Sequence, residues 1–187
     1  MTEKQDKKIR ELTLTAVLAS AAVIVNVIES SLPPLTPVYG VRLGLANVFT
    51  LFAIYALGRK QALAVLIIRI ALGNLLTGQA VSFVYSLSGG LLAYFAMLVL
   101  IRLIPFEQLW VIGGISAVFH NIGQITVAVA ITQTAEIIFY LPLLVVSGVI
   151  SGILTGTASY LVLKNLDKVG YVKIRHYKKL HKSEDKG

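Results

Sequence analysis

Long runs of apolar residues, separated by short polar stretches, make up most of the chain. The six longest runs cover residues 12–28, 40–58, 61–77, 80–101, 109–131 and 137–163. A helix rises about 1.5 Å per residue, so each run is long enough, or nearly so, to cross the ~30 Å hydrocarbon core of a bilayer. The pattern therefore predicts an all-α membrane protein with six transmembrane helices.

Basic residues lie at one end of these predicted helices. Of the 17 Lys and Arg residues, all but two precede the first run, follow the last, or lie in the turns after the second and fourth. The connections at the other end, at 29–39, 78–79 and 132–136, contain no Lys or Arg. Because cytoplasmic loops carry the excess of basic residues, we expect a plasma-membrane protein with both termini in the cytoplasm.

The chain divides into a membrane domain and two polar termini. Residues 1–11 form a charged cytoplasmic lead, 12–163 the six-helix domain, and 164–187 a basic cytoplasmic tail. With 56% hydrophobic and 14% charged residues, the chain is not a water-soluble domain. The net charge of +8 does not indicate a nucleic-acid binder, because the basic residues flank the apolar runs; we expect them to contact anionic lipid headgroups.

Arg42 and Arg69 are the two basic residues inside the predicted spans. An arginine in hydrocarbon costs at least about 2.5–3.5 kcal/mol, so Arg69, near the middle of its span, must face the protein interior or a wet cavity. It has two alternative roles, which are bridging helices through carbonyls or Asn74 and binding an anion. Two arginines that converge on one cavity suit a carboxylate or phosphate.

Other polar side chains occur at similar depth, in the half of the spans away from the basic ends. His120 and Gln124 are four residues apart and share a helix face, and Asn121 lies three residues before Gln124. Ligand binding, hydrogen bonding between helices and proton handling remain alternative roles for this group. The candidate substrate-binding residues are Arg42, Asn47, Arg69, Asn74, His120, Asn121 and Gln124.

Small residues mark two helix faces for close packing. Ala16 and Ser20 are four apart in the first span, and Gly148, Gly152 and Gly156 repeat at the same interval in the last. Small side chains let helix backbones approach closely in lipid, where no hydrophobic effect drives helices together. Each face is expected to contact another span or a partner protein.

Most catalytic chemistry is missing from the sequence. There is no cysteine, no phosphate-binding G-x-x-x-x-G-K-[ST] loop and no spacing of ligands typical of a metal site. The aspartates are scattered, and no acid lies within the spans to orient His120 as in a Ser-His-Asp triad. We therefore predict no catalytic residue, metal or cofactor, and the sequence favours a binding protein over an enzyme.

Four motifs carry a resemblance to a known family. They are Arg-Leu-Gly-Leu-Ala-Asn at 42–47, Gly-Asn-Leu-Leu-Thr-Gly at 73–78, Ser-Leu-Ser-Gly-Gly at 86–90 and His-Asn-Ile-Gly-Gln at 120–124. Together they resemble the bacterial heptaprenyl diphosphate synthase component I family, also called the Gx transporter family. The resemblance covers about residues 12–163.

This family is also similar to the substrate-binding S components of energy-coupling factor (ECF) transporters. That similarity implies a six-helix bundle, an outer-half substrate site, a first outer loop that covers it (here the Pro-rich segment 29–39) and a small-residue face on the first helix. Ala16 and Ser20 depart from the usual pair of alanines. The leading expectation is a subunit that captures a small anionic or amphiphilic molecule for uptake, with separate ATPase and coupling subunits as partners.

The alternative expectation is a non-catalytic membrane subunit of a heptaprenyl or polyprenyl diphosphate synthase, with a soluble synthase as its partner. Prenyl chain elongation needs aspartate-rich clusters to hold Mg²⁺ on diphosphates, and this chain has none. It is therefore not the catalytic subunit. A third, structural role as a scaffold held by the glycines of the last span remains open.

Overall fold

A computed structural model describes residues 3–33 and 41–170, and these form a bundle of helices without strands. The helices are α1 (Glu3–Ser30), α2 (Asn47–Ala56), α3 (Arg59–Thr77), α4 (Ala80–Leu103), α5 (Leu109–Thr132) and α6 (Leu141–Lys168), with short 3₁₀ helices at Phe106–Gln108 (η1) and Ala135–Tyr140 (η2). The all-α prediction is confirmed. Within the described ranges, five helices, all except α2, are long and apolar enough to cross a membrane.

The prediction of one helix over residues 40–58 is wrong in length. α2 has ten residues and is therefore about 15 Å long, half of what a bilayer crossing needs. The residues before it, 41–46, form an irregular segment in which Gly44 has a φ of +78°. Hydropathy does not separate the two parts, because segment 41–46 is itself mostly apolar. Val41, Arg42 and Ala46 are all less than a tenth exposed.

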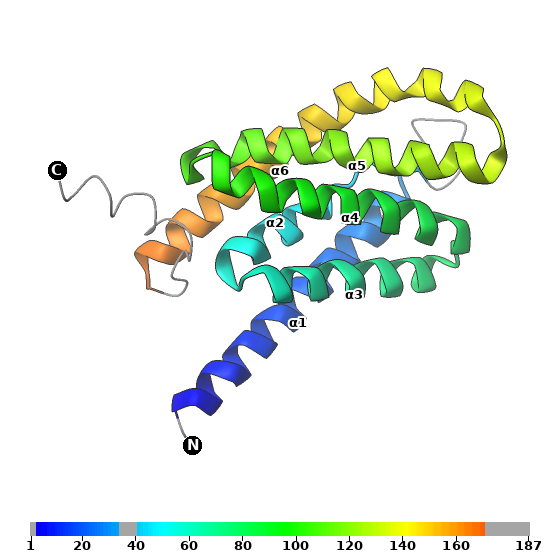
Figure 1. Cartoon of the computed structure of the whole chain (residues 1–187). Coiled ribbons are helices and arrows are strands. Elements are labelled where there is room, and N and C mark those ends of the chain that lie inside the picture. Colours follow the sequence, from blue (N-terminus) through cyan, green and yellow to red (C-terminus); the bar gives the residue numbers. More distant parts are fainter. Residues whose placement is uncertain (1–2, 34–40, 171–187) are drawn as a thin grey trace.

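α2 is nevertheless the central helix of the bundle, because it contacts each of the other five. α1 packs on α3, and α3, α4, α5 and α6 follow one another as neighbours (Figure 1). Three aromatic rings hold the end of α2 to the rest of the core: Tyr55 and Phe106 have ring centroids 5.5 Å apart, and Phe106 and Tyr160 5.3 Å apart. Segment 41–46 and α2 are thus enclosed by the longer helices.

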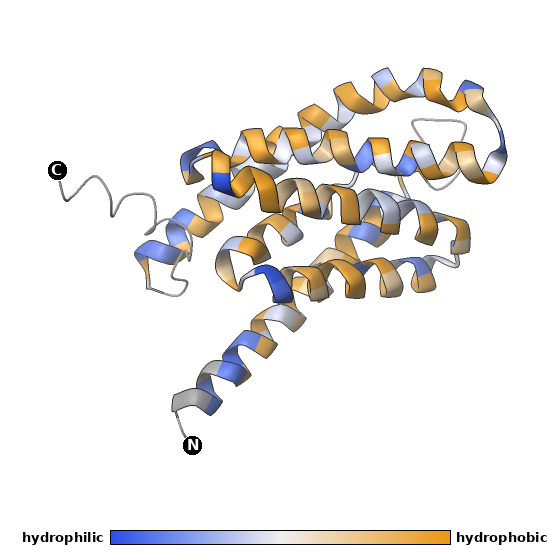
Figure 2. Ribbon diagram, in the orientation of Figure 1, coloured by the Kyte–Doolittle hydropathy of each residue, from blue (hydrophilic) through white to orange (hydrophobic). Residues whose placement is uncertain are grey.

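The two ends of the bundle differ in charge. The start of α1, the end of α6 and the connections before α3 and after α4 lie at the same end in Figure 1. Figure 2 shows hydrophilic residues in these segments. Arg59 and Lys60 begin α3, and Arg102 lies in the last turn of α4. Between the ends, the outer surface is apolar, with large exposed side chains such as Phe95 and Leu154. An apolar belt of this kind suits contact with lipid chains.

The Pro-rich segment lies only partly within the described structure. Pro33 follows the end of α1 and is exposed, whereas residues 34–40, including Pro34 and Pro37, lie outside the described residues. The same is true of most of the basic tail, from residue 171 onward. The proposed covering of a pocket by 29–39 therefore stays a prediction.

Candidate functional site

A cluster of polar side chains is buried where segment 41–46 meets α1, α3 and α5. We call it the polar cluster. Its members are Asn26, Glu29, Arg42, Asn47, Arg69, Asn74, Gln79, His120 and Gln124. Eight of these side chains are buried and Gln79 is half-buried. Six of the seven residues predicted for substrate binding lie in this cluster.

Arg42 is held by amide oxygens from three parts of the fold. Its guanidinium donates hydrogen bonds to Oδ1 of Asn26 in α1, to Oδ1 of Asn74 in α3 at 3.3 Å, and to Oε1 of Gln79 in the turn before α4 at 2.8 Å. The Arg42 side chain therefore points into the protein and is buried there. It ties the irregular segment to both α1 and α3.

Arg69 lies deeper, with 3% of its surface exposed. Its Nη2 donates to Oδ1 of Asn47 at 2.5 Å, while its own backbone carbonyl accepts a hydrogen bond from Nδ2 of Asn26 at 3.2 Å. Among the described residues, Nε of Arg69, Nδ2 of Asn47 and Nδ1 of His120 are buried and have no hydrogen-bond partner. Such orphaned groups are rare in native proteins, and an absent water or ligand is a usual explanation.

Side chains from distant helices satisfy the backbone of segment 41–46. Gln124 accepts a hydrogen bond from the Arg42 N–H at 2.8 Å and donates one to the Arg42 carbonyl at 2.7 Å. Glu29 accepts from the Gly44 N–H at 2.5 Å. Buried backbone N–H and C=O groups outside regular helices need hydrogen-bond partners, and these bonds supply them.

Gly44 is required by both conformation and space. Its positive φ lies in the left-handed region that side chains rarely adopt. A Cβ at this position would lie 2.7 Å from the His120 ring and 2.8 Å from Nδ2 of Asn47. Glycine therefore lets the irregular segment approach the imidazole of α5 and the start of α2.

Three members of the cluster, Asn26, Glu29 and Gln79, are absent from the residues predicted for substrate binding. Glu29 lies just beyond the end of the first apolar run. It is 6% exposed and lies within electrostatic range of both Arg42 and Arg69. A signal was present in the sequence. Glu29 continues the buried face of α1 that passes through Ala22 and Asn26 at spacings of four and three residues.

Asn121 is the predicted substrate-binding residue that the structure places elsewhere. Its Nδ2 donates to the carbonyl of Leu144 in α6 at 2.5 Å and packs against Gly148. It thus lies on the side of α5 that faces α6, whereas His120 and Gln124 face segment 41–46. In this structure, Asn121 connects two helices.

The glycines of α6 form a backbone contact with α5. A Cβ on Gly152 would overlap the carbonyl oxygen of Gly113, and one on Gly156 would overlap that of Leu109. Ala16 and Ser20 behave differently, because both are exposed on the outer face of α1. Their small side chains therefore make no close contact inside the described bundle.

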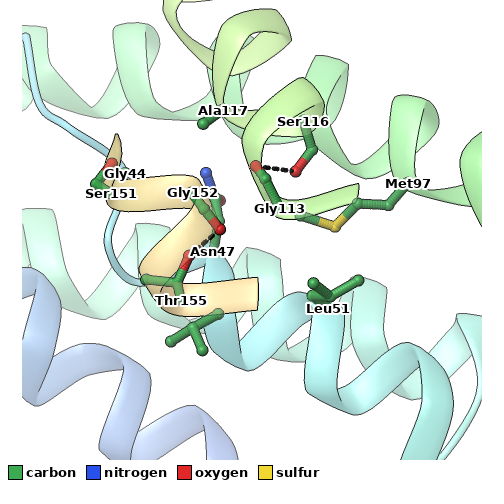
Figure 3. A pocket seen from close by; sticks show the side chains of 11 residues that line it. Gly44, Asn47, Leu51, Met97, Gly113, Ser116, Ala117, Ser151, Gly152 and Thr155 are labelled. Carbon is green, nitrogen blue, oxygen red and sulfur yellow. Dashed lines mark hydrogen bonds between the residues drawn. The ribbon is translucent and has the colours of Figure 1, made fainter. Parts of the chain in front are cut away.

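A small cavity lies beside the polar cluster, between α2, α5 and α6 (Figure 3). Asn47 and Leu51 contribute from α2, Ser116 from α5, and Ser151 and Thr155 from α6. The volume, about 10 Å³, has room for about one water molecule. The hydroxyls of Ser116 and Thr155 donate to the carbonyls of Gly113 and Gly152, so this wall combines polar oxygens with bare backbone.

The polar cluster brings together several potential hydrogen-bond donors. Two guanidinium groups and several amides converge, and charge-assisted hydrogen bonds from arginine suit carboxylate or phosphate oxygens. In the described part of the chain, no three His, Asp or Glu side chains are close enough to hold a metal ion. Nor does any carboxylate bond to His120 there to orient it as a general base.

Comparison with known proteins assigns the chain to a family. The motifs at 42–47, 73–78, 86–90 and 120–124 supply much of the polar cluster and of the α4–α5 contact, and all four fall inside one match to a family model. No curated protein and no solved structure matches the chain. The family model, for heptaprenyl diphosphate synthase component I, matches residues 18–162, and the chain therefore belongs to that family.

Proposed function

We propose that this protein is a non-catalytic membrane subunit of a polyprenyl diphosphate synthase and that its polar cluster binds the anionic group of a small amphiphilic molecule. The family match supports the first part. The second part depends on one observation, which is that Arg42 and Arg69 are both buried in the same cluster.

Burial of two guanidinium groups needs compensation, because moving a charge out of water costs several kcal/mol unless it is paired and hydrogen-bonded. Arg69 is bonded to Asn47, but its Nε remains without a partner among the described residues. A bound carboxylate or phosphate would accept from this group and add the opposite charge. The missing partner and counter-charge of Arg69 therefore support a bound ligand over a purely structural role in which Arg69 only bridges helices.

The non-catalytic assignment follows from the positions of the aspartates. Asp6 and Asp167 are exposed near the basic end of the bundle, far along the chain from each other, and Asp185 lies outside the described residues. The described structure has no group of three or more His, Cys, Asp or Glu side chains placed to hold a metal ion such as the Mg²⁺ on a diphosphate. Chain elongation would therefore take place on a separate soluble subunit.

We further propose six passes through the plasma membrane, with both termini in the cytoplasm. Segment 41–46 and α2 together would provide the sixth pass beside the five long helices. The basic residues at one end of the bundle support this orientation, which follows the positive-inside rule. The polar cluster would then lie in the outer half of the membrane.

That depth favours a second candidate function, the substrate-binding subunit of an uptake transporter. A site in the outer half is placed to receive a molecule from outside the cell, whereas a product made in the cytosol has its headgroup on the inner side. The exposed small residues Ala16 and Ser20 also offer α1 as a docking face for a coupling subunit. ATPase subunits would then supply the energy.

Co-purification separates the two functions. The tagged protein, extracted from its native membrane, should bring a soluble prenyl synthase with it under the synthase proposal, or ATPase and coupling subunits under the transporter proposal. Mass spectrometry of the eluate identifies the partner. Recovery of the transporter subunits without a synthase would contradict the synthase proposal.

A binding measurement tests the anion site itself. Purified protein in nanodiscs is titrated with farnesoic acid and with farnesyl diphosphate, which carry the same prenyl tail. Arg69→Ala should weaken binding of the preferred probe at least about tenfold, or ~1.4 kcal/mol. The matched control is Arg102→Ala. Arg102 is exposed in the last turn of α4, at the basic end of the bundle, and its removal should leave affinity within about twofold. Unchanged affinity in a folded Arg69→Ala variant would exclude Arg69 from the site.

A further inference from the structure

The charges buried in the polar cluster do not balance. Arg42 and Arg69 carry two positive charges, and Glu29 is the one acidic side chain buried among the described residues. Residues 34–40, which join the two described ranges, contain no charged side chain. With His120 neutral, the cluster therefore has one more positive charge than negative.

Glu29 is positioned as a counter-ion of both arginines. Its carboxylate accepts the Gly44 N–H at 2.5 Å and lies within electrostatic range of Arg69 and Arg42. It reaches this place from the buried face of α1, which also supplies Asn26 as an acceptor for Arg42. The carboxylate is thus fixed by the backbone that it satisfies, and its charge acts on the whole cluster.

We propose that Glu29 sets the charge of the ligand, so that the site selects a group with a single negative charge, such as a carboxylate, over a diphosphate. This inference rests on the proposed function of the polar cluster as an anion site. Glu29 is then a specificity-determining residue, because it neutralises one of the two arginines before any ligand arrives.

Electrostatics in a buried site supports this selectivity. A singly charged group would bring the cluster to neutrality, whereas a diphosphate would leave an excess of negative charge out of water. The excess would repel the Glu29 carboxylate, which is held in place by Gly44. In contrast, a second positive charge is available for a diphosphate only if the charge of Glu29 is removed.

The unpartnered donors show where the single charge would bind. Nε of Arg69 and Nδ2 of Asn47 are both buried without a partner among the described residues. They belong to one contact, because Oδ1 of Asn47 already accepts from Nη2 of Arg69. A carboxylate at this contact would meet donors of both side chains.

The test compares two probes in two proteins. Farnesoic acid and farnesyl diphosphate are titrated by calorimetry into wild-type protein and Glu29→Gln in nanodiscs. Glutamine keeps an oxygen to accept the Gly44 N–H, so the fold should be retained. Wild type should bind the carboxylate more tightly, and Glu29→Gln should change the ratio of the two dissociation constants at least about tenfold in favour of the diphosphate.

Two further variants control for charge and position. Glu136→Gln removes an exposed carboxylate at the same end of the bundle and should leave the ratio unchanged. The double variant Glu29→Gln/Arg42→Gln has the same net charge in the cluster as wild type and should regain the preference for the carboxylate. Size-exclusion chromatography establishes that each variant is folded.

The outcomes separate this inference from the function on which it rests. If both probes bind and depend on Arg69, but the ratio is the same in wild type and Glu29→Gln, the role of Glu29 is refuted and the anion site stands. Tighter binding of the diphosphate by wild type also refutes it, without any substitution. If neither probe binds any of the proteins, the anion site itself is refuted together with this inference.

Discussion

The side-chain amide of Gln124 binds both backbone polar groups of Arg42, accepting its N–H at 2.8 Å and donating to its carbonyl at 2.7 Å. The two residues are 82 positions apart in the chain. Gln124 thus replaces the hydrogen bonds that a helix would have given this residue, and α5 holds the irregular segment 41–46 in place. The polar cluster depends on this link, because the side chain of Arg42 extends from that segment into the cluster.

Gln124→Ala should destabilise the protein substantially. It leaves the N–H and the carbonyl of Arg42 buried without partners, at a cost of about 1–3 kcal/mol for each group. Thermal unfolding in detergent, followed by the loss of the monomer peak in size-exclusion chromatography, measures the effect. Thr126→Ala, which removes an exposed hydroxyl from the same helix, should stay within about 0.5 kcal/mol of wild type. Equal stability of both variants would contradict the proposed role of Gln124.

Two adjacent glycines of α5 should respond in opposite ways to alanine. In Gly113→Ala the new Cβ would overlap the carbonyl of Gly152, so the α5–α6 contact must open, and we expect loss of folded protein or a cost of at least about 1–3 kcal/mol. In Gly114→Ala the nearest atom is 3.6 Å away, an ordinary contact. This variant should be as stable as wild type or better by up to about 1 kcal/mol, because alanine favours helix. Comparing the yields and melting temperatures of the two variants is sufficient to test this.

Apolar run length predicted the long helices well but failed at α2. Five of the six predicted spans are helices of sufficient length, because burial in lipid requires continuous apolar sequence and internal hydrogen bonds. Residues 41–46 are also mostly apolar, so hydropathy extended the helix through them. The structure keeps these residues irregular instead, through the positive φ of Gly44 and hydrogen bonds to the distant residues Gln124 and Glu29. Such tertiary hydrogen bonds leave no periodic signal in a single sequence.

The candidate site was likewise predicted only in part from the sequence. Depth along the apolar runs groups Arg42, Arg69 and His120, and all three lie in the polar cluster. Depth does not fix the direction of a side chain around the helix, and Asn121 therefore bonds to Leu144 of α6 although its neighbours His120 and Gln124 face segment 41–46. Glu29 follows the first apolar run, where a charge near a helix end is normally solvated, whereas here it is buried and accepts a hydrogen bond from the irregular segment.

Substitutions on α1 should separate the protein's own stability from its partner contacts. Ala16 is exposed and Ala19 is 3% exposed, although both lie in the same turn of helix. Ala16→Leu should leave thermal stability unchanged, whereas Ala19→Leu should overpack the hydrophobic core at a cost of about 1–3 kcal/mol. Under the transporter proposal, Ala16→Leu should also release the coupling subunit during purification. A complex that survives Ala16→Leu would remove this face from the docking site.

Asn47→Asp should affect stability and binding in opposite directions. The asparagine oxygen already accepts from Arg69 at 2.5 Å, and its Nδ2 is buried without a partner in the described structure. Aspartate would remove that unpaired donor and place a second carboxylate on the arginines, so the ligand-free protein should melt higher. The same charge would neutralise the cluster, and binding of farnesoic acid should fall at least about tenfold. Asn47→Ala provides the contrast, because it removes the acceptor of Arg69 and should lower both stability and binding. An Asn47→Asp variant that melts higher and binds as tightly as wild type would show that the anion is held elsewhere.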